Sequence, residues 1–517
     1  MARKLKWLGM AVFFFALASV VSLWSYGRFA RHAQGAPGHA LAVAAAATPL
    51  DRRVAPLLAD HPGRSGMTLV QDNLDAFAAR ALSARVAARS LDLQYYIWHD
   101  DFTGRLLGNE LLQAADRGVR VRLLLDDLNA HGDDSILATL DSHPNIEVRM
   151  FNPMRNRSGT LSRASEMLLR LFSVNRRMHN KAWIADGRIA VVGGRNIGDE
   201  YFSAAADTNF VDLDALVVGP GVGQAESIFD EFWNGTGVIP LSALAKARPG
   251  ALQELRVRAQ NAATMLRDHP YLKRVRASSG MDEFLSGAAM HWPDRLQVLS
   301  DPADKVEGGD ESRWLVRPLA EAMLQARKSL HLVSPYFVPG DRGLAALRGM
   351  RARGVDVEVL TNSLAATDVL AVHSGYASYR KPLLQAGVVL YELKPGGTRD
   401  SSSLFGSSGA SLHTKAFSVD GDTGFIGSFN MDPRLVSLNT EMGVLFRDAD
   451  TATALERVYR DRTDARHSYR VRLQDGALRW DDMAARPPVE WDVEPETSAW
   501  QRAAVTVLGW LPIESLL

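Results

Sequence analysis

The sequence predicts an α/β protein that contains two similar domains in tandem, each a mixed β-sheet flanked by helices, after one N-terminal transmembrane helix. Three observations predict this fold. A His-x-Lys-x4-Asp motif occurs twice, a strand–helix–strand pattern precedes each copy, and an apolar segment begins near the N-terminus. At 517 residues, the chain is also too long for one ordinary hydrophobic core.

The first element is an apolar segment from Trp7 to Tyr26, which runs 20 residues without a charge. As a helix it would span about 30 Å, the thickness of the hydrocarbon core. Its length favours a membrane anchor or uncleaved signal over residues 1–27, and the alternative is a cleaved signal peptide with its cut at Ala44–Ala47. Three basic residues precede the segment and two follow closely, which favours a body outside the cytoplasm.

The next elements connect this anchor to the first domain. Residues 28–66 are rich in Ala, Gly, Pro and His, which is typical of a tether, and residues 67–90 are predicted to form an amphipathic helix. The other predicted boundaries are a first domain over 67–245, a connecting segment over 246–295, a second domain over 296–465 and a C-terminal extension over 466–517.

Both domains contain the same strand–helix–strand pattern. In the first, strands at 91–98 and 119–127 flank a helix at 105–116. In the second, strands at 329–338 and 355–362 flank a helix from 343. The segment Arg117–Val119 recurs 236 residues later, and the motif histidine recurs 234 residues later. This nearly constant offset indicates an internal repeat.

Each motif is predicted to be a hairpin with chemically useful side chains on one face. Its His and Lys are two residues apart on a strand and therefore project to the same side. Asp-Gly then forms the turn, and a Gly-rich bend brings an Asn beside the pair. The candidates are His179, Lys181 and Asn196 in the first copy and His413, Lys415 and Asn430 in the second. The aspartates, Asp186 and Asp420, are expected to support the hairpins.

This set of side chains suits a phosphate ester. Lysine and asparagine hold the phosphoryl oxygens, while one imidazole attacks phosphorus and a second protonates the leaving oxygen. A zinc site is disfavoured because a lysine close to the histidine repels a cation. The absence of cysteine excludes a thiol nucleophile, and equal numbers of acidic and basic residues, 59 of each, argue against nucleic acid.

The chain resembles the phospholipase D superfamily and, within it, the bacterial cardiolipin synthases of the C type, from about residue 73 to the last residue. The resemblance is carried by NRRMHNKAWIADG, VGGRNIGDEYF, LHTKAFSVD, SLNTEMG and WLPIESLL. The doubled motif is typical of the superfamily, and its flanks are typical of the C type. The resemblance implies two phospholipase D-like domains with the active site at their interface.

The resemblance also implies roles for the candidates. One histidine becomes a phosphohistidine while the other acts as acid and then as base; His179 is the expected nucleophile and His413 the expected acid, although the sequence alone does not distinguish them. The lysines and asparagines are expected to stabilise the phosphoryl oxygens. Asp214 and Glu441, aligned by the apolar strands that follow them, are expected to orient the imidazoles, the alternative being solvated strand ends.

The implied activity is a phosphatidyltransferase of the bacterial inner membrane, without metal or cofactor, and with its body in the periplasm. Phosphatidylglycerol is one substrate, and a second phosphatidylglycerol, phosphatidylethanolamine or CDP-diacylglycerol is the donor. A small alcohol such as ethanolamine is a possible further acceptor. The alternatives are a phospholipase D hydrolase, a nuclease and a catalytically silent lipid-binding scaffold. The sequence does not determine the oligomeric state or the need for an accessory protein.

Three segments are candidates for contact with lipid. Residues 155–177 contain six arginines and one acidic residue among apolar side chains, which indicates an interfacial helix or an ordinary amphipathic one. The Gly/Ser-rich segment 396–411 is a candidate lid or a plain connector. The apolar C-terminus, 500–517, is expected either to dock on a membrane or to cover the core.

Overall fold

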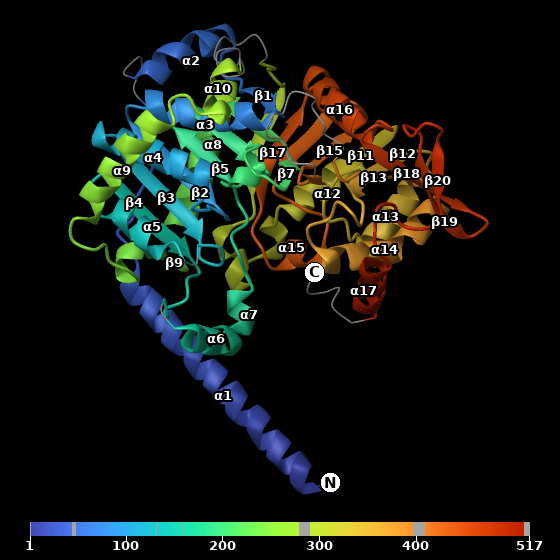
Figure 1. The fold of residues 1–517 in the computed structure, drawn as a ribbon, viewed down its shortest axis with the longest axis horizontal. Coiled ribbons are helices and arrows are strands. Elements are labelled where there is room, and N and C mark those ends of the chain that lie inside the picture. The colour runs from blue at the N-terminus through green and yellow to red at the C-terminus, as the bar shows by residue number, and fades with distance from the viewer. Residues whose placement is uncertain are drawn as a thin grey trace.

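The protein consists of two α/β halves, one after the other in sequence, with a long N-terminal helix that projects from the first half (Figure 1). The computed structural model describes residues 2–43, 48–130, 132–157, 159–278, 290–396 and 409–510. Each half is built around one mixed sheet. This arrangement confirms the predicted α/β fold with two sheet-and-helix domains.

The first sheet has the strand order β1-β8-β6-β5-β2-β3-β4-β9, with β2, β3 and β4 parallel and the remaining pairs antiparallel. Its strands are β1 (Gly66–Val70), β2 (Ser90–Tyr95), β3 (Arg120–Asp126), β4 (Ile146–Phe151), β5 (Ala182–Ala185), β6 (Ile189–Gly193), β8 (Asp214–Val218) and β9 (Val238–Pro240). The α-helices of this half and the following connection are α1 (Ala2–Ala33), α2 (Pro49–Asp60), α3 (Asn73–Val86), α4 (Phe102–Asp116), α5 (Asp134–Asp141), α6 (Thr160–Leu169), α7 (Leu171–Val174), α8 (Pro220–Trp233), α9 (Ala251–Met265) and α10 (Pro270–Ala277).

The second sheet repeats this order in its first eight strands and then adds two: β10-β17-β16-β15-β11-β12-β13-β18-β19-β20. Its strands are β10 (Arg295–Ser300), β11 (Ser329–Val333), β12 (Asp356–Asn362), β13 (Val389–Leu393), β15 (Lys415–Val419), β16 (Thr423–Gly427), β17 (Met442–Arg447), β18 (Ser468–Gln474), β19 (Ala477–Asp482) and β20 (Val489–Trp491). The α-helices are α12 (Val316–Leu324), α13 (Gly340–Ala352), α14 (Leu370–Gln385), α15 (Pro433–Ser437), α16 (Ala449–Thr463) and α17 (Ala499–Gly509). The internal repeat is therefore a structural one.

Local sequence explains the repeated unit. In the first half, Asp101 caps α4 by accepting a hydrogen bond from the amide of Gly104 at 2.9 Å. The helix ends at Asp116, and Gly118 follows shortly after with a φ of +94°, which favours glycine. The apolar strand β3 follows and is buried between its parallel neighbours β2 and β4, as its near-continuous hydrophobic run predicts.

The halves meet through two kinds of contact. Buried apolar side chains from β6, β8, β16 and β17 form one hydrophobic cluster between the sheets. In addition, β7 (Thr208–Val211) of the first half pairs in parallel with β14 (Gly409–Leu412) of the second. A parallel bridge between Met178 and Thr440 is the counterpart of this pairing in the other direction. Both pairings lead directly into motif residues.

The structure corrects two expectations near the N-terminus. Residues 67–90 do not form one helix, because β1 pairs with β8 and Asp72 then caps a separate helix, α3. Residues 48–60 of the expected tether are docked on the first half: Thr48 caps α2, and Leu50 and Val54 are completely buried. The capping box stabilises the start of the helix, and the buried apolar side chains hold it against the domain.

Two further boundaries also differ. Helix α1 continues to Ala33, beyond the expected end at residue 27. The C-terminal extension is not separate from the second domain. Its strand β18 pairs with the edge of β13, and its strands β19 and β20 extend the same sheet further. Helix α17 then packs against α14. Residues 397–408 of the candidate lid and 511–517 of the C-terminus lie outside the described residues.

Candidate active site

The first motif histidine is held by the second half of the protein. The amide of His179 donates to the carbonyl of Thr440 at 2.9 Å, and its Nδ1 lies 2.9 Å from Oε2 of Glu441. Glu441 directly precedes β17 and is completely buried. A carboxylate on Nδ1 sets the orientation and tautomer of the ring and leaves Nε2 for chemistry.

The second motif histidine is held in the same way by the first half. The amide of His413 donates to the carbonyl of Val211 at 2.8 Å, and its Nδ1 lies 2.6 Å from Oδ2 of Asp212. Each imidazole is therefore oriented by a carboxylate from the opposite half. The two half-sites are assembled only when the halves pack together.

The expectation that Asp214 orients an imidazole is wrong. Its Oδ2 accepts a hydrogen bond from Arg80 at 2.9 Å and lies 3.3 Å from Arg195, so Asp214 belongs to a buried ion pair inside the first domain. The residue in the position of Glu441 is Asp212, two places earlier. Because side chains in a strand alternate with a period of two, a slip of two residues keeps the same face and cannot be detected from the hydrophobic pattern.

The turn that precedes Asp212 and the turn that precedes Glu441 differ in one residue, and each residue matches the carboxylate that it contacts. A Cβ atom at Gly194 would collide with the carboxylate of Asp212, so glycine is required for this close approach. The corresponding residue in the second half is Ser428, whose hydroxyl donates to Oε2 of Glu441. The Gly-Gly and Gly-Ser versions of the turn therefore match different carboxylates.

The motif lysines are buried beside the histidines. Nζ of Lys181 donates to the carbonyl of His179 at 2.7 Å, and Lys415 makes the same bond to His413. Burial lowers the pKa of Lys181 well below its usual value and lowers that of Lys415 to about 8. Two buried ammonium groups on neighbouring motifs are costly unless negative charge compensates them, which suits a site that receives a phosphate group.

The two asparagines differ. The side chain of Asn196 accepts from the amide of Ile97 at 3.1 Å and donates to the hydroxyl of Tyr201 at 2.9 Å. Neither side-chain polar atom of Asn430 has a hydrogen-bond partner among the described residues, although the residue is completely buried. Unpaired buried amide groups are unfavourable, so Asn430 is better placed than Asn196 to bind a substrate oxygen.

The electrostatics of the two histidine–carboxylate pairs are unequal. Burial lowers the pKa of His413 and lowers that of His179 well below its usual value, and nearby lysines add to both effects. Burial raises the pKa of Glu441 well above its usual value. Burial also acts to raise the pKa of Asp212, but the charges of His413, Lys415 and Arg195 outweigh it and hold the pKa below its usual range. Only the second pair therefore keeps a low-pKa carboxylate.

Aromatic residues that the sequence did not single out line both imidazoles. The ring of Tyr96 lies 4.9 Å from that of His179, with Nζ of Lys181 5.4 Å from the same tyrosine. The rings of Tyr201 and Phe210 lie 5.3 and 5.0 Å from His413. These rings exclude water from the imidazoles, whose residues are only 8% and 5% exposed. The positions of these aromatic residues in or near strands and turns could have suggested them as candidates. Their contacts with the imidazoles, however, depend on how the chain packs.

The motif aspartates lie at the hairpin turns and make no hydrogen bond to the imidazoles among the described residues. Asp186 accepts from the amides of Ala88, Arg89 and Ser90, and Asp420 accepts from those of Arg327, Lys328 and Ser329. Each aspartate ties a hairpin to the start of the neighbouring strand, β2 or β11.

Replacing Asp186 with Ala should destabilise the first half. Three backbone donors around a completely buried carboxylate would lose their acceptor, at a cost of about 3 kcal/mol or more. We expect a lower melting temperature in a thermal unfolding experiment. Asp420→Ala is the matched control with a smaller shift, because Asp420 is only partly buried. Equal shifts for the two variants would contradict this assignment.

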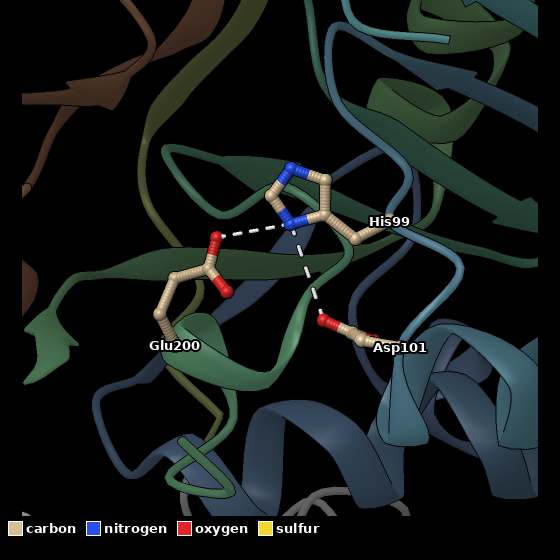
Figure 2. A group of neighbouring side chains, drawn as sticks. All are labelled: His99, Asp101 and Glu200. Carbon is tan, nitrogen blue, oxygen red and sulfur yellow. Dashed lines mark ion pairs between the residues drawn. The ribbon is translucent and has the colours of Figure 1, made fainter. Parts of the chain in front are cut away.

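Two other clusters have a donor set that could bind a divalent cation, within the part of the chain that the structure describes. In the first, Nδ1 of His99 lies 3.3 Å from Oε1 of Glu200 and 3.9 Å from Oδ2 of Asp101 (Figure 2). Asp101 already accepts two backbone hydrogen bonds, and the other two residues form an ion pair. The second cluster comprises His331, Asp356 and Glu358. Neither cluster contains a motif histidine.

Comparisons with known proteins agree on one group. The sequence matches the family described as "Cardiolipin synthase, PLD-like domain" over residues 83–233 and 319–462. It is 43% identical to cardiolipin synthase C of Escherichia coli (strain K12), covering 90% of this chain and 98% of that protein. It is 27% identical to cardiolipin synthase A of Pseudomonas syringae pv. syringae (strain B728a), covering 78% and 70%.

A solved structure has a similar fold. The phosphatidylserine synthase of Haemophilus influenzae Rd KW20 superimposes with a TM-score of 0.56 and 13% sequence identity, covering 90% of this chain and all of that one. This similarity shows that the two-domain arrangement is shared.

Proposed function

This chain belongs to the cardiolipin synthase family of phospholipase D-like proteins, and we propose that it transfers a phosphatidyl group to phosphatidylglycerol through a phosphohistidine intermediate. It is an enzyme of the phosphatidyltransferase class and a homologue of cardiolipin synthases. The observation that carries the proposal is the pair of buried imidazoles, each held at Nδ1 by a carboxylate of the opposite half.

The first half-reaction forms the covalent intermediate. Nε2 of His179 attacks the phosphorus of the donor lipid, and the bond between phosphorus and the head-group oxygen breaks. His413 gives its proton to that oxygen, and the head-group alcohol leaves. Lys181 and Lys415 neutralise the non-bridging oxygens, and Asn430 donates its unpaired amide to them.

The second half-reaction releases the product. The hydroxyl of phosphatidylglycerol loses its proton to His413 and attacks phosphorus, and the bond to His179 breaks. Water would give phosphatidic acid in the same step. The aromatic walls and low exposure of both histidines support transfer over hydrolysis, because they limit the access of water.

The unequal carboxylates support this assignment of roles. A general acid must bind a proton and release it again, and the low-pKa carboxylate of Asp212 stabilises the imidazolium form of His413. The nucleophile must be a neutral imidazole. Burial lowers the pKa of His179 well below its usual value, which keeps its ring neutral near neutral pH.

The activity should decline at alkaline pH. Lys415 has a pKa of about 8. In the free enzyme its side chain is therefore a charged ammonium below that pH and a neutral amine above it. Because the charged form is the one that neutralises phosphate, kcat/KM should fall as the pH rises through about 8. We expect Lys415→Arg to change the position of this alkaline limb, since arginine stays charged while Lys181, whose pKa is also lowered, still titrates. An unchanged alkaline limb in this variant would contradict the role of Lys415.

The protein is membrane-associated, in keeping with its relatives and with one helix, Lys4–Ala33, that is long and apolar enough to cross a bilayer. We propose that this helix remains as an anchor in the bacterial inner membrane, with the catalytic body in the periplasm. The excess of basic residues before its apolar stretch supports this orientation. Labelling with a membrane-impermeant reagent in intact cells and in inverted vesicles tests it.

Lipid analysis tests the function and identifies the donor. The purified full-length protein is given labelled phosphatidylglycerol alone, then with phosphatidylethanolamine, then with CDP-diacylglycerol, and the products are identified by mass spectrometry. Labelled cardiolipin in any mixture supports the synthase, and the mixture that yields it identifies the donor. Added ethanolamine or glycerol tests for small acceptor alcohols. Phosphatidic acid as the sole product throughout would overturn the proposal in favour of a hydrolase.

A further inference from the structure

Helix α6 and the start of α7 expose large apolar side chains that the active site does not use. Leu161 is 81% exposed, and Leu168, seven residues later and therefore on the same helical face, is 56% exposed. Met167 and Leu171 are also exposed. On the opposite side, Glu166 and Arg170 are buried and paired with each other at 2.8 Å. The buried ion pair between Glu166 and Arg170 holds the polar side of the helix against the protein, so the apolar face points outward.

Contacts with α1 fix the level of this face relative to the membrane-crossing helix. The guanidinium of Arg170 lies 3.3 Å from the ring centre of Tyr26, and that of Arg155 lies 4.7 Å from the ring centre of Phe29. Arg155 also donates to the hydroxyl of Ser25 at 3.3 Å. These residues of α1 directly follow Trp24, which ends the strongly apolar stretch and is 63% exposed. Tryptophan at such a position marks the bilayer interface.

The arginines of this segment have a structural role that its sequence did not show. Arg157, Arg170 and Arg177 are each paired with a carboxylate: Arg157 with Asp127 and Asp134, Arg170 with Glu166, and Arg177 with Asp126. Arg177 thereby also holds the backbone just before His179. The apolar side chains, more than a broad cationic surface, are what the segment presents.

A second helix with the same exposed spacing lies in the other half. Trp500 and Val507 of α17 and its C-cap residue Trp510 are 79%, 53% and 76% exposed, and their spacing of seven and three residues places them on one face. Val505, on the other face, is buried. Figure 1 shows α17 at the edge of the body that also contains α6 and α7, the edge from which α1 extends.

We propose that α6, the start of α7, and α17 form a membrane-docking surface that lies at the boundary between head groups and acyl chains of the bilayer crossed by α1. The surface consists of Leu161, Met167, Leu168, Leu171, Trp500, Val507 and Trp510. Amphipathic helices with large apolar side chains bind bilayers in this position. The contacts of the α6 and α7 segment with α1 just after Trp24 select the lipid interface as the occupant, in place of a protein partner.

The docking surface brings the catalytic site close to its lipids. Helix α7 ends at Val174, five residues before His179, and five residues span at most about 17 Å. A short segment therefore links the docking surface to the catalytic histidine, which suits an active site that receives a phosphodiester from the bilayer. This inference rests on the proposed activity on membrane lipids and deepens it.

The absence of cysteine makes a direct test possible. Single-cysteine variants Leu161→Cys, Leu168→Cys and Val507→Cys of the full-length protein are labelled with an environment-sensitive fluorophore and reconstituted in phosphatidylglycerol-containing vesicles. Met265→Cys is the control, because Met265 is 84% exposed at the end of α9, which leads to α10 on the side of the body away from α6 (Figure 1).

We expect the three surface labels to emit at shorter wavelength, to be quenched by lipids that carry a nitroxide near the head group, and to be protected several-fold from aqueous iodide. The control label should show none of these effects. Iodide quenching of the labels on either helix equal to that of the control would overturn the proposal. This readout requires no lipid product, so its failure is distinguishable from failure of the proposed transferase activity.

Discussion

Replacing either His179 or His413 with Ala is expected to abolish phosphatidyl transfer, lowering kcat by more than ~10⁴-fold. In the proposed mechanism each imidazole carries a step that the other cannot perform, because one forms the bond to phosphorus and the other moves the proton. Both residues are buried in a packed interface, so the variants should be checked for folding by circular dichroism before their lipid products are measured.

A third buried histidine is the matched control. His143 is 4% exposed and bonds to Asp116, outside the network that surrounds the motifs. His143→Ala should retain kcat per folded molecule even if it lowers the melting temperature. Retention of full activity by either motif variant would refute the two-histidine scheme.

The same variants separate the roles of the two histidines. With a donor whose leaving group needs no proton, such as a p-nitrophenyl ester of phosphatidic acid, His413→Ala should still form a covalent phosphatidyl adduct on His179. His179→Ala should form none. Peptide mass spectrometry under neutral conditions detects the adduct, and an adduct on His413 in the His179 variant would exchange the two roles.

The second large effect is expected at Asp212. Its Oδ2 accepts the proton on Nδ1 of His413, and in Asp212→Asn the amide can present a donor there, which favours the wrong tautomer. We expect kcat to fall by about 10²- to 10⁴-fold with little change in the melting temperature. The pKa of His413 should fall further, because the charge that stabilises its imidazolium is removed.

Asp214→Asn is the matched comparison, two residues away in the sequence. It weakens the buried ion pair with Arg80 and Arg195, at a cost of about 3–5 kcal/mol, while His413 keeps its carboxylate. We therefore expect a large drop in melting temperature and a nearly normal kcat per folded molecule. The reverse pattern, with Asp214→Asn inactive but stable, would restore the assignment that the structure overturned.

The sequence predicted much of the fold because its signals are local. The strands β2 and β3, the helix between them and their counterparts in the second half follow from hydrophobic runs and from Gly at the ends of helices. The predictions failed where a short strand looked like part of a helix, as in β1, or where ion pairs held an apparently flexible segment, as in α2, whose Asp51 pairs with Arg89 and Arg188. In both cases the deciding contacts lie far along the chain.

The sequence by itself determined the doubled motif, the two α/β domains, the family and an N-terminal segment long and apolar enough to cross a membrane, because each depends on residues that are close together in the chain. Only the tertiary structure decided which carboxylate serves which histidine. Asp212 is 201 residues from His413, and Glu441 is 262 residues from His179. A strand pattern with a period of two accepts Asp212 and Asp214 equally, and only the packing of one half against the other places Asp212 beside the imidazole.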